Sequence, residues 1–244
     1  MRSLLAALAL STAIVTPAHA GPAEDYTELR EEVWQATLDS QPQLATSVGD
    51  RRGDGKLGDI SLAEYDRQIA ENRAYLARLN AIDESALPED LRIDYAVLKR
   101  SFEDGLAGAA FDQNRYVIFT NRGGWFTWFA SLPYRSPLFT TADYESYVSR
   151  LEAFAQVNAD GIARSREAVS RGLTQPCGPM VGLEDRISQQ IFDDYTQSPF
   201  WNPFNEKPST ISDAEWNGLK DRASAALEEA IFPSYREFRD FYVN

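Results

Sequence analysis

Histidine and cysteine, two residue types that often carry enzyme chemistry, occur once each in this 244-residue chain, as His19 and Cys177. Histidine is the commonest metal ligand and the usual general base near neutral pH, so the position of His19 decides which mechanisms are open. Cys177 lies among turn-forming residues, without a basic neighbour that would favour its reactive thiolate. A buried small side chain, a partner for another chain and a reactive site are its three alternatives, and catalysis is the least favoured.

His19 lies in a segment with the layout of a secretory signal peptide. Residues 1–20 begin with the cationic Arg2, continue with an apolar run over residues 4–15, and end in Ala18, His19 and Ala20. This run of 12 residues is too short for a permanent membrane anchor, which needs about 20. Cleavage near Ala20 leaves a chain without histidine, exported to the periplasm or secreted. A buried N-terminal helix is the alternative.

A mature chain without histidine leaves carboxylate chemistry as the main catalytic alternative, because acid-pair hydrolases work with two carboxyl groups. Adjacent acids occur at residues 184–185, 193–194 and 228–229. The chain holds 37 acidic residues, so solvated helix faces explain each pair more simply. We therefore assign no catalytic residue.

The acidic, glycine-rich loop at residues 49–59 invites comparison with a calcium-binding EF-hand loop. Counted from Asp50, positions one, five and six match that pattern. Positions three and twelve, which should be acidic, are Arg52 and Ser61. The sequence therefore predicts a solvated loop, and we assign no metal ligand and no cofactor to this chain.

Four aromatic side chains are candidates for a binding surface. Trp125, Trp128 and Phe129 belong to the densest aromatic segment, and Trp201 lies in a second aromatic loop at residues 198–205. Such rings beside turn residues can form a wall for a sugar, a peptide or an apolar ligand, but they more often fill a core between helices. The core is the favoured interpretation and the ligand wall is the alternative.

The net charge limits the partners of the chain. Lys and Arg number 24 against 37 Asp and Glu, which gives a formal charge of −13. An acidic chain does not attract a phosphate backbone, so binding of nucleic acid through a basic surface is disfavoured. Hydrophobic residues at 43% and charged residues at 25% are typical of an ordinary globular protein.

Helical periodicity dominates the chain after residue 20, and capping residues predict where helices begin. Ser61 and Ser212 each precede a glutamate by three residues, which is the pattern of a capping box. Gly172 should end the longest helix, and Pro233 should kink the last helix or begin a new one. Apolar stripes predict helices over residues 23–39, 61–80, 88–106, 141–171 and 212–231, with an aromatic continuation to residue 242.

Residues 111–139 lack this periodicity. Residues 116–119 have a strand-like composition, and residues 121–124 have the composition of a turn. We therefore predict a mainly α protein, a multi-helix array that forms a single domain over residues 21–244. The aromatic-rich segment near 111–139 should be irregular, with short strands as an alternative.

Five stretches occur in a defined order along the mature chain. They are Pro42-Gln-Leu-Ala-Thr46 with Gly49-Asp50, Leu91-Arg-Ile-Asp-Tyr95 with Leu98, Pro137-Leu-Phe-Thr-Thr-Ala-Asp-Tyr144 with Tyr147 and Arg150-Leu151, Arg171-Gly-Leu-Thr-Gln-Pro176, and Ile231-Phe-Pro-Ser-Tyr-Arg236. No stretch is diagnostic alone, but the ordered set resembles the N-terminal half of the bacterial domain-of-unknown-function 885 (DUF885) proteins. The resemblance covers most of the mature chain.

This resemblance implies an exported, mainly helical protein more than twice as long as this chain, similar to zinc-dependent peptidases with a His-Glu-x-x-His motif. In such a motif the two histidines hold zinc and the glutamate activates water. The family carries this motif in its C-terminal half, so no zinc ligand is assigned to a position in this chain.

Two functions from different classes are therefore expected. The first is the cleft-forming N-terminal half of an exported zinc peptidase or hydrolase, truncated before the metal site and inactive alone. Its partner would be the missing C-terminal half, and its substrate a peptide or a small molecule. The alternative is a self-contained periplasmic ligand-binding module that uses the aromatic loops.

Overall fold

The computed structural model describes residues 21–244. The predicted signal peptide and His19 lie outside the described residues. The helices of the described part are α1 (Pro22–Ser40), α2 (Pro42–Ser47), α3 (Leu62–Asn80), α4 (Glu89–Gly108), α5 (Asp112–Tyr116), α6 (Trp125–Phe129), α7 (Leu132–Arg135), α8 (Thr141–Ser170), α9 (Cys177–Met180), α10 (Leu183–Ser188), α11 (Asp213–Ala226) and α12 (Phe232–Val243). Shorter turns are the 3-10 helices η1 (Arg51–Gly53), η2 (Glu84–Ala86), η3 (Tyr195–Gln197) and η4 (Pro199–Phe204), and the π-helical turn η5 (Leu227–Ile231). The prediction of a mainly α fold is confirmed.

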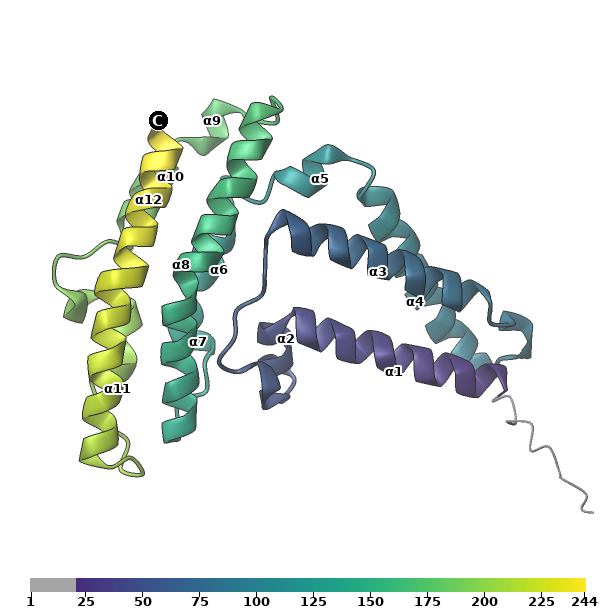
Figure 1. The fold of residues 1–244 in the computed structure, drawn as a ribbon, viewed down its shortest axis with the longest axis horizontal. Helices are drawn as coiled ribbons and strands as arrows, with labels where there is room; N and C mark the ends of the chain where they lie inside the picture. The colour runs from purple at the N-terminus through teal and green to yellow at the C-terminus, as the bar shows by residue number, and fades with distance from the viewer. Residues whose placement is uncertain (1–20) are drawn as a thin grey trace, which may run out of the picture.

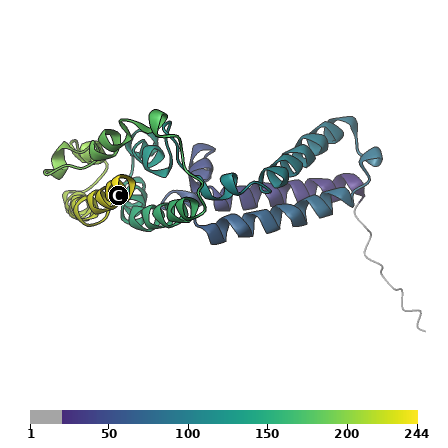
Figure 2. The same ribbon diagram turned by 90° about the horizontal axis from the view of Figure 1, so that it is seen from above.

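Three long helices, α1, α3 and α4, form an arm that projects from the rest of the molecule (Figures 1 and 2). Their apolar stripes face one another around Tyr26, Leu79 and Tyr95, which are almost completely buried. The Tyr95 hydroxyl donates a hydrogen bond of 3.1 Å to the Leu79 carbonyl oxygen, which ties α4 to α3. The arm therefore has an apolar cluster of its own.

The second group of helices is built on α8, which runs beside α11 and α12 (Figure 1). A larger apolar cluster fills the space between these helices and the aromatic segments at residues 125–129 and 200–204. Leu151, Phe154 and Tyr235 are completely buried in it. The loop after α2 and the segment around α5 connect the arm to α8, so α8 is the element on which both parts meet.

The capping residues begin the helices where the sequence predicts. The Ser61 hydroxyl accepts a 3.2 Å hydrogen bond from the Glu64 amide at the start of α3, and Ser212 forms a reciprocal box with Glu215 at α11. At the C-terminal end of α8, Gly172 has a φ angle of +71°, which is the left-handed conformation expected of a residue that ends a helix. These boundaries are local, which is why the sequence predicts them well.

The aromatic segment at residues 111–139 differs from the prediction in one respect. It contains the short helices α5, α6 and α7, and the strand-like residues 116–119 pair with no strand in the described part of the chain. A single bridge between Thr120 and Gly123 closes the predicted turn. The alternative of short strands is therefore wrong, because Ile118 and Phe119 pack against the large apolar cluster and do not pair with a neighbouring strand.

Pro233 lies in the first turn of α12, where a missing amide hydrogen breaks no helical bond. The new helix is one of the two predicted outcomes. The chain enters it through the π-helical turn η5, which the periodicity of the sequence does not reveal. The extra residue in this turn keeps Ile231, Phe232 and Tyr235 all buried against the cluster.

Gly161 allows α6 to approach the middle of α8. A Cβ atom at this position would lie 2.6 Å from the Trp125 ring, closer than real Cβ atoms approach other heavy atoms. The Trp125 indole N–H also donates a 3.1 Å hydrogen bond to the Asn158 side chain, one turn away on α8. The close approach of the indole therefore requires a glycine at this position inside the long helix.

We expect Gly161→Ala to destabilise the protein by about 1–3 kcal/mol, because the new methyl group displaces Trp125 from a packed site. The matched control is Gly218→Ala on α11, where nothing lies within 4 Å of the added Cβ. That change should stabilise by about 0.5–1 kcal/mol, the ordinary gain of alanine over glycine inside a helix. Urea unfolding followed by circular dichroism measures both, and equal effects of the two variants would contradict the close packing at Gly161.

Candidate functional site

Helix α8 carries two buried arginines on one face. Arg150 and Arg164 are 3% and 7% exposed, and their spacing of 14 residues is close to four helical turns. Burial of a guanidinium is costly unless its N–H groups are hydrogen-bonded. Burial lowers the pKa of both arginines from the usual value. The acceptors of the Arg150 and Arg164 hydrogen bonds therefore identify the segments that the two arginines hold in place.

Arg150 holds the loop that follows α2. Its Nε donates to the Lys56 carbonyl oxygen at 3.0 Å, and its Nη2 donates to the Thr46 hydroxyl at 2.7 Å and to the Gly53 carbonyl oxygen at 3.1 Å. Gly53 in turn lies so close to Pro42 that an added Cβ would be 2.9 Å from its backbone. The loop after α2 is thus held by hydrogen bonds to Arg150 of α8 and by close packing of Gly53 on Pro42 of α2.

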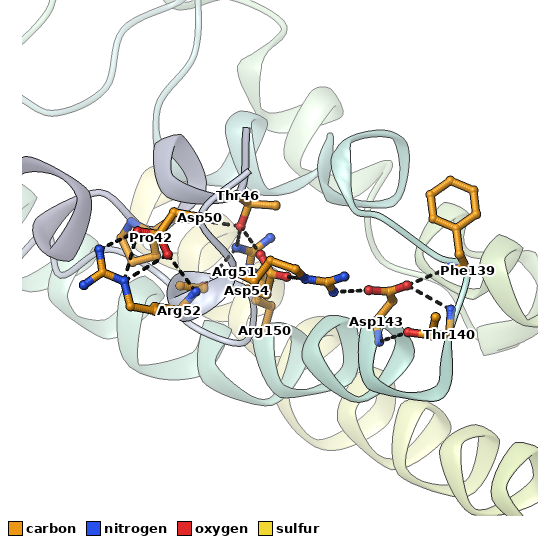
Figure 3. A network of polar contacts seen from close by, with 11 residues as sticks. Pro42, Thr46, Asp50, Arg51, Arg52, Asp54, Phe139, Thr140, Asp143 and Arg150 are labelled. Carbon is orange, nitrogen blue, oxygen red and sulfur yellow. Dashed lines mark hydrogen bonds and ion pairs between the residues drawn. The ribbon is translucent and has the colours of Figure 1, made fainter. Parts of the chain in front are cut away.

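A network of charged groups extends from Thr46 to the start of α8 (Figure 3). The Thr46 hydroxyl lies 2.7 Å from Asp54 Oδ1, and Arg51 Nε donates to Asp54 Oδ2 at 2.8 Å. Arg51 also pairs with Asp143, which caps α8 by accepting from the Thr140 amide at 2.8 Å. Asp54 is only 5% exposed. The prediction of a solvated loop was therefore wrong for its centre, because long-range contacts with α8 bury it.

The electrostatics of this network favour the ionised carboxylates. Burial opposes ionisation of Asp143, but hydrogen bonds from Arg51, Thr140 and the Phe139 amide together hold its pKa below the usual value. At the outer edge of the loop, hydrogen bonds from Arg52 lower the pKa of Asp50 to about 2. The acids that suggested a calcium loop are thus occupied by arginines.

Arg164 holds the other connection between the arm and α8. Its Nη1 donates to the Ile60 carbonyl oxygen at 3.0 Å, and its Nε donates to the Arg115 carbonyl oxygen. Its guanidinium lies 5.0 Å from the centre of the Tyr65 ring, in cation–π geometry. The two arginines of α8 therefore position the walls around the cavities described next.

Two neighbouring cavities lie between α2, α6 and α8, and α7 also borders the larger of them. The larger has a volume of about 400 Å³ and is bordered by Arg135 and Arg150; we call it the arginine cavity. The smaller has a volume of about 260 Å³ and is bordered by Arg164. Gln43 and Trp128 border both cavities. Trp128 therefore stands between two hollows, each next to a buried arginine.

The four aromatic residues predicted for a ligand wall have different surroundings. Trp125, Phe129 and Trp201 are 6%, 1% and 5% exposed and belong to the large apolar cluster. Phe129 stacks on Phe154, with the ring centres 3.8 Å apart. Trp128 is half-buried at the edge of this cluster. Trp125 also borders the smaller cavity, so the structure brings two of the four residues to a hollow.

A third hollow, larger than these two cavities, is a groove of about 1360 Å³ between the ends of α8 and α12 and the segment around α9. We call it the terminal groove. Val169, Val181 and Val243 border it and are 56%, 85% and 55% exposed. Cys177 is exposed at the terminal groove, which excludes the predicted alternative of a buried small side chain. A partner for another chain and a reactive site remain as its alternatives.

The zinc that the sequence resemblance implies does not fit the described residues. Residues 21–244 contain no histidine, and among them no three His, Cys, Asp or Glu side chains are grouped closely enough to hold a metal ion. The three adjacent acid pairs are exposed to solvent; residues 184–185 lie on α10 and residues 228–229 on η5, whereas residues 193–194 lie in the loop before η3. In the part of the chain that the structure describes, no helix is long and apolar enough to cross a membrane.

Sequence reasoning missed the two buried arginines, although one signal was present. Arg150 follows Tyr147 by three residues and precedes Phe154 by four, so it adjoins the apolar stripe of α8. Arg164 repeats this position four turns later. A charged residue beside such a stripe indicates a buried hydrogen-bonding role, but its partners are far away in the sequence and cannot be read from it.

The fold and these sites define a mainly α protein in which the long helix α8 organises an arm, two cavities and a groove. The family model described as "Bacterial protein of unknown function (DUF885)" matches residues 42–244, and the chain belongs to this family. No curated protein matches the chain.

A solved structure has the same fold. It is described as that of "the putative lipoprotein from Colwellia psychrerythraea", and it matches with a TM-score of 0.80 and 14% sequence identity. The match covers 91% of this chain and 41% of that chain. This chain therefore spans less than half the length of that protein, and at this identity the likeness concerns the fold alone.

Proposed function

We propose that this chain forms the N-terminal, cleft-forming part of an exported zinc-dependent peptidase or related hydrolase, and that it is inactive by itself. The observation that carries the proposal is the terminal groove, which is large and bordered by exposed apolar side chains. Exposed apolar surface of this kind marks a contact or binding site. Export is supported by the layout of residues 1–20 and by the description of the structural neighbour as a lipoprotein.

The chemistry of the terminal groove suits a peptide or another segment of protein. Its apolar wall is flanked by Arg166 and Arg236 and by Glu184, Glu237 and Asp240. Apolar surface with a few charged groups of both signs can hold side chains and also orient a polar backbone. In this proposal, residues 21–244 bind and orient the peptide, and the metal ligands belong to a part of the protein outside these residues.

Two measurements on the purified mature chain test this proposal. Elemental analysis after equilibration with zinc should find no stoichiometric metal, and a peptide-library assay should find no hydrolysis. The nucleotide sequence beyond codon 244 should encode His-Glu-x-x-His in the same or a shifted frame. Stoichiometric zinc with hydrolysis by this chain alone, or a genuine stop followed by unrelated sequence, would contradict the proposal.

A matched pair of variants tests the role of the terminal groove. When the polypeptide encoded downstream is added to the purified chain, a complex should form that Val181→Asp weakens at least tenfold. Val97→Asp on α4 changes a residue that is also well exposed, at 64%, but lies outside the groove, and it should leave binding unchanged. Equal binding by both variants would show that the groove is not the contact surface.

A ligand-binding module remains a second candidate, because Trp128 borders two cavities. This candidate expects a monodisperse protein that unfolds cooperatively and whose tryptophan fluorescence is quenched by a ligand to saturation. Aggregation, or an apolar surface that binds dye, would instead favour a chain that lacks a complementary part.

A further inference from the structure

The arginine cavity differs in charge from the rest of the protein. Arg135 and Arg150 border it, and no aspartate or glutamate does, although the chain as a whole carries a formal charge of −13. The carboxylates of the neighbouring network, Asp54 and Asp143, are paired with Arg51 and do not border the cavity. The cavity is therefore bordered by two cationic side chains and by no acidic one, on a protein that is acidic as a whole.

Several hydrogen-bond donors of this cavity are not used within the described residues. Arg150 donates through Nε and Nη2, but its Nη1 makes no hydrogen bond to residues 21–244. The Arg135 guanidinium, the Gln43 amide and the Trp128 indole N–H likewise donate to no described residue, although all three residues border the cavity. Hydrogen-bond donors on residues that border one hollow, with no acceptor among the described residues, are available to an anionic ligand.

The hydroxyl groups of Ser131 and Ser136 do not compete for this role. Ser131 donates to the Trp128 carbonyl oxygen at 2.7 Å, and Ser136 donates to the Leu132 carbonyl oxygen at 3.0 Å. Their protons are thus used inside their own turns. The two guanidinium groups, one amide, one indole and the Tyr134 hydroxyl remain as donors, and Arg150 is held in place by the loop contacts described above.

The other walls of the cavity are apolar. Trp128, Leu132 and Pro137 border it, and its volume of about 400 Å³ is in the range of sites for small molecules. An inorganic anion would leave this apolar surface unused, whereas an organic acid would cover it. Arginine binds carboxylates through two parallel N–H bonds, which adds orientation to charge.

We propose that the arginine cavity binds a small organic carboxylate with an aromatic or aliphatic body. The carboxylate lies against Arg135 and Arg150, and the body packs on the Trp128 ring. This inference deepens the ligand-binding candidate and does not depend on the hydrolase proposal, which the zinc and hydrolysis measurements test separately. The C-terminal end of a peptide and a free acid share this chemistry.

The test uses N-acetylphenylalanine as the probe and N-acetylphenylalaninamide as its neutral equivalent. In titration calorimetry on the mature chain, the acid should bind at a 1:1 ratio and the amide at least tenfold more weakly. A short peptide that ends in phenylalanine, with a free or an amidated C-terminus, distinguishes a peptide end from a free acid. Equal binding of acid and amide, binding of inorganic phosphate alone, or no binding of the acid at millimolar concentration would overturn the proposal.

Two arginine variants assign the binding to the cavity. Arg135→Gln should weaken the acid at least tenfold and reduce the preference over the amide; it is exposed and makes no ion pair with a described residue, so the fold is retained. Arg92→Gln is the matched control, because Arg92 is also exposed without an ion pair but lies on α4, away from the cavity. If Arg135→Gln binds the acid as tightly as the unchanged protein does, the assigned site is wrong.

Discussion

Phe129→Ala should destabilise the protein by about 3–5 kcal/mol, the usual cost of removing a fully buried aromatic side chain from a core. Phe129 is 1% exposed, stacks on Phe154 and lies 5.2 Å from the Phe200 ring. It thereby joins α6, α8 and η4, which are far apart in the sequence. The free energy of unfolding in urea, measured by circular dichroism and tryptophan fluorescence, checks this value.

The matched control is Phe139→Ala, which removes the same side chain from a position that is 75% exposed. The Phe139 amide donates to Asp143 through the backbone, and the substitution keeps this bond. We expect a change within about 0.5 kcal/mol, as for most surface substitutions. A small effect of Phe129→Ala as well would mean that this ring lines an open wall, which was the alternative that the sequence left for it.

The helix ends could be predicted because they depend on neighbouring residues. Ser61, Thr140 and Ser212 accept hydrogen bonds from amides three residues later, and Gly172 takes a backbone conformation that other residues avoid. Each signal is contained in four or five residues. The sequence therefore predicts most of the long helices, with small errors in the positions of their ends.

The cavities could not be predicted, because they depend on contacts between distant segments. Arg150 reaches Lys56 across 94 positions of sequence, and Tyr235 reaches the Phe126 carbonyl oxygen across 109. No local pattern shows which loop a buried arginine will hold. The same limit explains why the composition of residues 116–119 leaves short strands as an alternative, since this composition is apolar whether the residues pair with a strand or pack on helices.

The position of Trp128 shows that the aromatic composition predicts where rings are packed but not which ring stays partly exposed. The density of rings near residue 125 correctly indicates a region of packing, and three of the four candidate rings lie in the core. Which ring stays half-exposed is decided by the direction of the short helix α6 against α8, and the close approach at Gly161 sets that direction. Trp128 is thereby left at the edge, between the two cavities.

Arg150→Met should destabilise the protein by about 2–4 kcal/mol, because it removes three charge-assisted hydrogen bonds, one of them to the buried Gly53 carbonyl oxygen, and leaves the Lys56 carbonyl oxygen without its donor. The Gly53 carbonyl oxygen keeps a bond of 2.9 Å from the Lys56 amide, but the Lys56 carbonyl oxygen has no other donor among the described residues. Methionine fills much of the space, so the lost free energy reports the hydrogen bonds and not a cavity. Hydrogen exchange of the amides at residues 51–58 should become faster than that of α12, because the loop loses its fastening before the core does.

Arg100→Met on α4 is the control for this change. Arg100 pairs with Asp104 at 2.8 Å, but its side chain is 72% exposed, and such surface pairs contribute little. Its loss should change stability by less than about 0.5 kcal/mol. If both variants were equally stable, the arginine on α8 would be a surface charge in solution, and the loop that borders the arginine cavity would owe its position to Gly53 and Pro42 alone. A large effect confined to Arg150→Met, with fast exchange in the loop, instead means that the buried Arg150 guanidinium holds this loop in place at the edge of the arginine cavity.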